Sequence, residues 1–237
     1  MKEETKFKQL IPEPMPLIKE RKGGGLNLIY VALLLEAARM VDDGIDILSI
    51  EDAAKKAFGI SKGFLVLMDE VGIPKAVSAM EALSTDSEPE DPIYKIYRNF
   101  FTPAQSCKRM IEAYERTEDK KAVRWVSEED AQKQAADFLL VGSLKRRFQA
   151  VSFMIASELV ESGILGLQDV ERLCKETFGW EEGPFSMMNR LGIQQALQIV
   201  TEKMELSHRK EINFPIPWLL IRRAQKNEPW PLNSKLT

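Results

Sequence analysis

The sequence is poor in the residues that build metal centres, disulfide frameworks and histidine-based catalytic sites. Its 237 residues include two cysteines and one histidine. Cys107 and Cys174 are far apart and belong to no CxxC motif, which argues against a zinc site or a disulfide framework and suits a reducing cytoplasm. His208 lies in a polar segment with no carboxylate, serine or cysteine in a recognisable relation to it. We therefore interpret His208 as a surface residue rather than as part of a catalytic dyad.

The sequence also lacks long apolar runs and a large excess of charge of one sign. No apolar stretch approaches the ~20 residues that span a bilayer, and residues 1–6 are charged with no apolar segment behind them. The 33 basic and 36 acidic residues are interspersed, with a formal net charge of -3, so there is no basic field for nucleic acid. We expect a soluble cytoplasmic protein that binds neither membrane nor nucleic acid.

What is present is an internal duplication, because most of residues 23–83 recurs at residues 144–200. Four glycines mark the two copies at an offset of 119 or 120 residues: Gly44, Gly59, Gly63 and Gly72 match Gly163, Gly179, Gly183 and Gly192. Glycines in register at the ends of helical runs indicate positions of positive φ or of close backbone approach. A period this long indicates a duplicated domain rather than a solenoid.

Apolar periodicity predicts helices in both copies. The first long helix opens at Gly23-Gly24-Gly25, and its apolar stripe comprises Leu26, Ile29, Tyr30, Leu33, Leu34, Ala37, Met40 and Val41. A second long helix is expected over residues 139–160. Shorter helices are expected from Ser49, as N-cap, to Gly59, over residues 64–83 with a break near Gly72, over 110–118, from Ser127, and over 193–206.

No β-α-β alternation occurs, so the predicted class is all-α, with two tandem duplicated helical domains. We place a lead-in at residues 1–22, the first domain at 23–126 and the second at 127–237. Residues 84–92, which are polar, acidic and interrupted by proline, form the clearest linker.

Two places could hold a ligand. Gly23-Gly24-Gly25 could cradle a phosphate, but the strand, the glycine spacing and the acidic residue of a dinucleotide fingerprint are all missing, which favours a hinge. Asn27 lies in the first turn of the long helix. Its side chain either caps the helix or faces solvent, or its amide holds a substrate carbonyl.

Other polar and sulfur-bearing residues have plainer interpretations. We interpret Lys145-Arg146-Arg147 as a solvated face with packed stems rather than as an anion site. Asp69 and Glu70 are expected to cap or pair within their turn. The methionines of the second copy are expected to fill the core rather than to bind a ligand: Met154, Met187 and Met188.

Several segments together resemble the C-terminal part of the 3-hydroxyacyl-CoA dehydrogenases, including the tandem C-terminal domains of the multifunctional β-oxidation proteins. The matching segments are residues 16–23, Asn27 nine residues before Glu36, Asp43-Gly44, residues 49–52, 59–63 and 67–72, Gly183-Pro184-Phe185, and residues 217–230. The resemblance implies helical domains of the 6-phosphogluconate dehydrogenase C-terminal-like fold, and a homodimer. It also implies that Asn27 binds the thioester substrate beside a catalytic histidine.

The chain departs from the family pattern in ways that bear on activity. We expect the family's NAD-binding domain, with its glycine fingerprint and its catalytic histidine, glutamate and serine, to be missing before residue 1. Leu28 replaces an arginine, Arg146 occupies the position of Asn27 in the second copy, and Arg124-Trp125-Val126 is the candidate remnant of a glycine-aromatic strand. Hydride transfer needs a base and a nicotinamide, so we expect this chain to bind no cofactor and to be inactive alone. NAD would enter through a partner domain or a separate chain.

Two functions follow from the resemblance. The chain is either the C-terminal part or subunit of an NAD-dependent 3-hydroxyacyl-CoA dehydrogenase of fatty acid β-oxidation or related acyl-CoA metabolism, supplying the acyl-CoA cleft and the dimer interface. Alternatively, it is a non-catalytic helical module that binds an acyl-CoA, a lipid or a protein partner.

Overall fold

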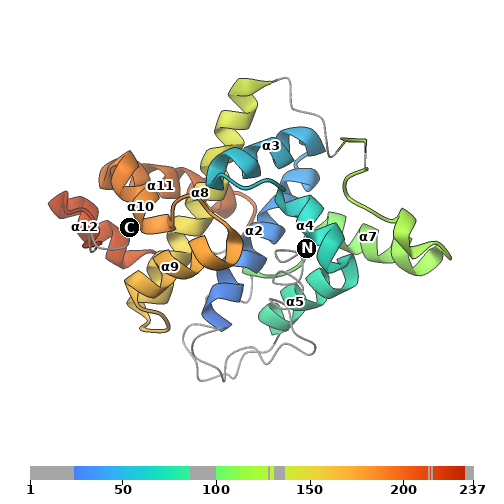
Figure 1. Ribbon diagram of the computed structural model, residues 1–237, viewed down its shortest axis with the longest axis horizontal. Coiled ribbons are helices and arrows are strands. Elements are labelled where there is room, and N and C mark those ends of the chain that lie inside the picture. The colour runs from blue at the N-terminus through green and yellow to red at the C-terminus, as the bar shows by residue number, and fades with distance from the viewer. Residues whose placement is uncertain are drawn as a thin grey trace.

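The computed structural model describes residues 24–85, 100–127, 129–130, 137–212, 214 and 216–232. Within these ranges the chain is helical and contains no strand, so the all-α prediction is confirmed (Figure 1). The predicted lead-in and most of the predicted linker lie outside the described residues. No helix within the described ranges combines the length and apolarity needed to cross a membrane.

Each copy consists of one long helix followed by shorter ones. The first copy contains α2 (Gly24–Asp42), α3 (Ile47–Phe58), α4 (Phe64–Val71), α5 (Ile73–Thr85), α7 (Gln105–Arg116) and the 3-10 turn η1 (Lys120–Ala122). The second copy contains α8 (Phe138–Glu161), α9 (Leu167–Phe178), α10 (Pro184–Leu191), α11 (Ile193–His208) and α12 (Trp218–Lys226). In Figure 1, α2 and α8 cross at the centre, with α4, α5 and α7 to the right and α9 to α12 to the left.

Two predicted helix starts have different outcomes. Ser49 is not the N-cap of α3, because the helix begins at Ile47 and Asp46 precedes it with a carboxylate that accepts from the Ser49 backbone N–H at 2.8 Å. Asp46 is the N-cap because its side chain reaches the third N–H group of the helix, which an N-cap side chain usually binds. Ser127 does cap its turn, since its Oγ accepts from the Asp130 N–H at 3.0 Å. The rest of that predicted helix, residues 131–136, lies outside the described residues.

The paired glycines have the backbone properties expected of them. Three pairs have positive φ: Gly44 and Gly163 at 77° and 70°, Gly59 and Gly179 at 70° and 69°, and Gly72 and Gly192 at 99° and 91°. The fourth pair, Gly63 and Gly183, has ordinary φ and instead allows a close approach. A Cβ built on either residue would stand 2.4–2.5 Å from the Cδ of a buried glutamate.

Those glutamates cap the next helix in each copy. Glu51 of α3 accepts from the Leu65 N–H of α4 at 2.8 Å, and Glu171 of α9 accepts from the Phe185 N–H of α10 at 3.0 Å. Each carboxylate therefore satisfies a free N–H at a helix start and meets the positive end of the helix dipole. Burial raises the pKa of Glu51 to about 7, although the backbone N–H groups favour its ionised form.

A second repeated contact joins the end of each long helix to the last helix of its copy. Asp42 accepts from the backbone N–H groups at the start of α7 and pairs with Arg109 at 3.0 Å. In the second copy Glu161 accepts from Leu219 N–H at the start of α12 at 3.0 Å and pairs with Arg222 at 2.5 Å. Helices α7 and α12 are therefore counterparts, although the sequence of α7 shows this poorly.

A third repeated contact fixes the closing segment of each copy. Asp69 accepts from the backbone N–H groups of Trp125 and Val126 at 2.8 Å and 3.0 Å, so the prediction that it caps or pairs within its own turn is wrong. Asn189 does the same work in the second copy, accepting from Trp230 N–H at 2.7 Å and donating to Trp230 O at 3.0 Å. Both tryptophans are buried. Residues 124–126, the candidate remnant of a glycine-aromatic strand, form no strand, and the docked Trp125 makes them the counterpart of the segment around Trp230.

The two copies share one hydrophobic core. Phe58 stacks on Trp180 with ring centroids 4.0 Å apart, and Phe58 O accepts from Glu181 N–H at 3.0 Å. Tyr30 stacks on Phe178 at 5.4 Å. Such aromatic pairs each stabilise a protein by about 0.5–1.5 kcal/mol beyond the effect of the area they bury. Contacts between the two copies therefore contribute to the stability of the whole fold. The predicted limits between residues 22 and 23 and between 126 and 127 stay predictions.

Candidate functional site

Asn27 lies in the first turn of α2, half-buried between Leu26 and Leu28, which are both buried. Among the residues that the structure describes, its side-chain amide has no hydrogen-bond partner. Helix α2 contacts α5 and α9, and its start is the lower blue end of that helix in Figure 1. A helix start presents free N–H groups and a positive dipole end, so a carbonyl oxygen that gains negative charge would be favoured there.

The second copy does not repeat an amide at this position. Arg146, the counterpart of Asn27, pairs with Glu202 of α11 at 2.7 Å, and both side chains are substantially exposed. Gln198 also donates to Glu202, at 3.0 Å. Arg146 is the ninth residue of α8, whereas Asn27 is in the first turn of α2, so the second copy has neither the amide nor the free helix start at this position.

Arg147 corrects the interpretation of residues 145–147 as a solvated face. Its side chain is only 13 % exposed and lies between two carboxylates, Glu36 at 2.9 Å and Asp43 at 2.9 Å. The interpretation is wrong for Arg147 because three consecutive residues of a helix project in different directions. One of these directions is toward the other copy.

Glu36, Arg147 and Lys203 form a buried cluster between the copies, which we call the ionic trio. Glu36 of α2 is fully buried, and Lys203 of α11 is buried with its Nζ 2.8 Å from a Glu36 carboxylate oxygen. Burial alone would raise the pKa of Glu36, but the nearby charges of Lys203, Arg147 and Arg39 hold it below its ordinary value. Burial lowers the pKa of Lys203 to about 8 despite the attraction of Glu36. The pKa of Glu36 is lowered because three cations surround one carboxylate, whereas the pKa of Lys203 is lowered mainly by its burial.

Aromatic rings and one more ion pair surround the trio. Lys203 lies 5.3 Å from the centroid of the Phe214 ring, which packs on Phe100 with centroids 4.5 Å apart. Arg39 lies over the Phe100 ring, 4.8 Å from its centroid, and donates to Phe100 O. Lys210 pairs with Asp43 at the solvent side. The trio was not identified from the sequence, although Glu36 interrupts a buried apolar stripe and a charge in such a stripe requires a partner.

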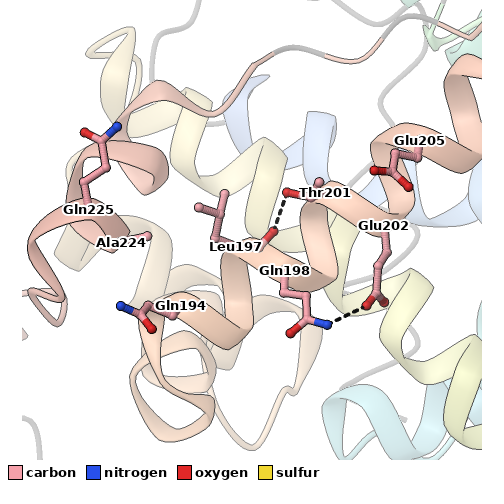
Figure 2. A pocket seen from close by; sticks show the side chains of 8 residues that line it. All are labelled: Gln194, Leu197, Gln198, Thr201, Glu202, Glu205, Ala224 and Gln225. Carbon is pink, nitrogen blue, oxygen red and sulfur yellow. Dashed lines mark hydrogen bonds between the residues drawn. The ribbon is translucent and has the colours of Figure 1, made fainter.

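A surface groove of about 510 Å³ separates α11 from α12. Figure 2 shows Gln194, Ala224 and Gln225 at one end, Glu202 and Glu205 at the other, and Leu197 and Gln198 between them. The lining residues are Gln194, Leu197, Gln198, Thr201, Glu202, Glu205, Ala224 and Gln225. The groove begins beside the Arg146–Glu202 ion pair, and six of its eight lining residues carry polar side chains.

The remaining candidates have the plain roles expected of them. His208 is exposed at the end of α11. Cys107 and Cys174 are free and buried, and burial raises the pKa of each thiol. The three methionines of the second copy lie in the core, as predicted: Met154, Met187 and Met188. No group of three or more potential metal ligands occurs within the described ranges.

Comparison with known proteins identifies the family. The family described as 3-hydroxyacyl-CoA dehydrogenase, C-terminal domain, matches residues 26–125 and 144–227, so each match covers one copy of the duplication. A search of the curated proteins finds no match. The match covers more than half of the chain and confirms the resemblance seen in the sequence. The chain belongs to the family of 3-hydroxyacyl-CoA dehydrogenase C-terminal domains.

Proposed function

We propose that this chain supplies the acyl-CoA cleft of an NAD-dependent 3-hydroxyacyl-CoA dehydrogenase in fatty acid β-oxidation or related acyl-CoA metabolism. The observation that carries the proposal is the family match over both copies, together with Asn27 at the position that binds the thioester in this family. The side-chain amide of Asn27 can donate to the thioester carbonyl oxygen. The free N–H groups at the start of α2 would stabilise charge on that oxygen as the reaction proceeds.

The rest of the reaction requires groups from elsewhere. Hydride transfer needs a base near the 3-hydroxyl and a nicotinamide facing the carbon that bears it. His208, the one histidine of the sequence, lies at the exposed end of α11, on a different helix and in a different copy from Asn27. We therefore expect an NAD-binding domain or a separate chain to provide the base and the nicotinamide.

Turnover of acetoacetyl-CoA with NADH tests this proposal. We expect loss of nicotinamide absorbance only when the chain is combined with an NAD-binding domain of the family. Asn27→Ala should lower kcat/KM about 10²-fold, the usual effect of removing one donor to a developing oxyanion. Arg146→Ala, at the equivalent position of the second copy, should leave kcat/KM unchanged. Full activity of the Asn27→Ala variant would refute the role given to Asn27.

A second function is favoured by Leu28. This residue replaces the family's arginine beside Asn27 and is buried in the core, so no charged side chain stands at that position. A chain of this kind would bind acyl-CoA without supporting catalysis. It predicts calorimetric binding of acetoacetyl-CoA that is independent of NAD and no turnover with any NAD-binding chain.

We also propose a homodimer, as the family resemblance implies, and a cytoplasmic location, as the cysteine content suggests. The two copies already bury the faces of α2 and α8 against each other within one chain. A dimer would therefore need a further surface, such as the exposed Ile216 and Trp218 before and at the start of α12. Light scattering would give the mass directly, and a mass of about 27 kDa would rule the dimer out.

A further inference from the structure

The ionic trio is present at only one of two equivalent places in the duplicated fold. At the offsets of 119 and 120 residues that relate the copies, Glu36, Arg147 and Lys203 correspond to Ile155, Leu28 and Leu83. These three apolar residues are all buried members of the core, and we call them the apolar counterpart. The same helix positions are therefore filled by charge on one side of the molecule and by hydrocarbon on the other.

This difference indicates that the charges of the ionic trio serve the geometry of the fold rather than its stability. A buried ion cluster must recover the desolvation of every charge, and well-packed apolar residues of similar volume often stabilise as well or better. The apolar counterpart places buried apolar side chains at the equivalent positions of this fold. Ion pairs at 2.8–2.9 Å, in contrast, tolerate little sliding, whereas apolar side chains can repack after a small shift. Charge at this position therefore specifies one register of the helices.

The constrained helix is the one that carries Asn27. Glu36 follows Asn27 by nine residues on α2, which is about two and a half turns and about 13 Å along the axis. The two side chains thus project from opposite faces of α2. Arg147 of α8 and Lys203 of α11 hold Glu36 on one face, so any rotation or sliding of α2 at the trio would displace the amide of Asn27.

We propose that the ionic trio sets the register of α2 against the second copy, which makes Glu36 a positioning residue for Asn27. This inference rests on the proposed acyl-CoA site at Asn27. Asp43 and Lys210 support the same arrangement from the solvent side, because Asp43 shares Arg147 with Glu36. Arg39 adds a further cation nearby, but it is engaged by the Phe100 carbonyl and ring.

The chain itself supplies the variant that tests this idea. Glu36→Ile, Arg147→Leu and Lys203→Leu together convert the trio into its apolar counterpart. We expect this triple variant to keep its helical circular dichroism and at least the wild-type urea midpoint, yet to bind acetoacetyl-CoA at least 10-fold more weakly in calorimetry. The matched control is Arg146→Gln with Glu202→Gln, which removes an exposed ion pair from the same two helices, each residue one position from a member of the trio. The control should bind like the wild type.

The outcomes separate the inference from the function on which it rests. A stable triple variant with wild-type affinity overturns the inference. If the triple variant does not fold, Glu36→Gln provides the test, because it removes both ion pairs of Glu36 while Arg147 keeps Asp43 as a partner; unchanged affinity in that variant likewise overturns the inference. Should the wild type not bind acetoacetyl-CoA, the proposed function fails. The register is then read from the side-chain amide resonances of Asn27, which should shift in the triple variant and not in the control; equal spectra would refute the inference.

Discussion

Gly63 lies directly against the carboxylate of Glu51, with the position of a Cβ only 2.5 Å from the glutamate Cδ. Gly183 and Glu171 repeat this relationship at 2.4 Å. The backbone of Gly63 has φ of -80°, which any residue can adopt, so contact rather than conformation excludes a side chain. The buried carboxylate could move away only by giving up its hydrogen bond to Leu65 N–H.

Gly63→Ala should therefore destabilise the protein by about 1–2 kcal/mol, the usual value of a lost helix cap. Urea unfolding would measure the change. A double-mutant cycle provides the control, because Glu51→Ala removes the obstructing carboxylate, and the added cost of Gly63→Ala in that background should fall toward zero. Additive costs would mean that the two residues do not interact as described.

Asp69→Asn should be tolerated, because Asn189 already holds Trp230 at the equivalent place in the second copy. The amide oxygen can accept from Trp125 N–H as the carboxylate does, so we expect the free energy of unfolding to change by no more than about 1 kcal/mol.

Burial raises the pKa of Asp69 to about 6 from an ordinary 3.8. A raised pKa contributes stability at low pH that is lost as the pH rises through about 6.

The measurement is the free energy of unfolding of both proteins from pH 3.5 to 7. The wild type should lose stability relative to Asp69→Asn over this range, since the native carboxyl binds a proton that the unfolded one releases. Asp69→Ala is the control for the hydrogen bonds themselves and should be less stable than Asp69→Asn at every pH. Parallel curves for the wild type and the asparagine variant would contradict the assignment.

The fold could be predicted to a large extent because its determinants are local. The apolar stripe of α2, the break at Gly72 and the positive φ of Gly59 each depend on residues within one or two turns. The duplication strengthened the prediction, since a pattern that is weak in one copy is visible in the other. Ser49 shows the limit, because Asp46 competed for the same cap and the sequence does not rank the two.

The contacts that connect the copies could not be predicted in the same way. Glu36 and Arg147 are 111 residues apart in sequence, and no local pattern pairs them. The role of Asp42 at the start of α7 also depends on a contact over more than 60 residues. Asn27, in contrast, was found through the spacing of a known family, and its environment beyond α2 depends on how three helices meet.

Glu211→Gly should stabilise the protein by about 0.5–1 kcal/mol. Glu211 follows α11 with φ of 59°, a left-handed conformation that costs a residue with a Cβ and costs glycine little. Asn227, which ends α12 with φ of 53°, provides the matched control, because asparagine tolerates this conformation. Asn227→Gly should change the urea midpoint less than Glu211→Gly does. The reverse order would show that Glu211 gains compensating contacts in its turn.

Lys203→Met should remove a pH dependence of stability in the alkaline range. The native pKa of Lys203, about 8, lies below its ordinary 10.5, so between these values the unfolded chain binds a proton that the native protein does not. Wild-type stability should therefore rise relative to the variant from pH 8 to 10.5, by an amount on the order of 1–3 kcal/mol. Below pH 8 the desolvation of the charged Lys203 side chain destabilises the native protein. Because Arg147 still pairs with Glu36 in the variant, the variant should be at least as stable as the wild type in this pH range. Urea titrations at each pH would test both statements, and a wild-type advantage at pH 7 would mean that the lysine–glutamate attraction outweighs the desolvation of Lys203.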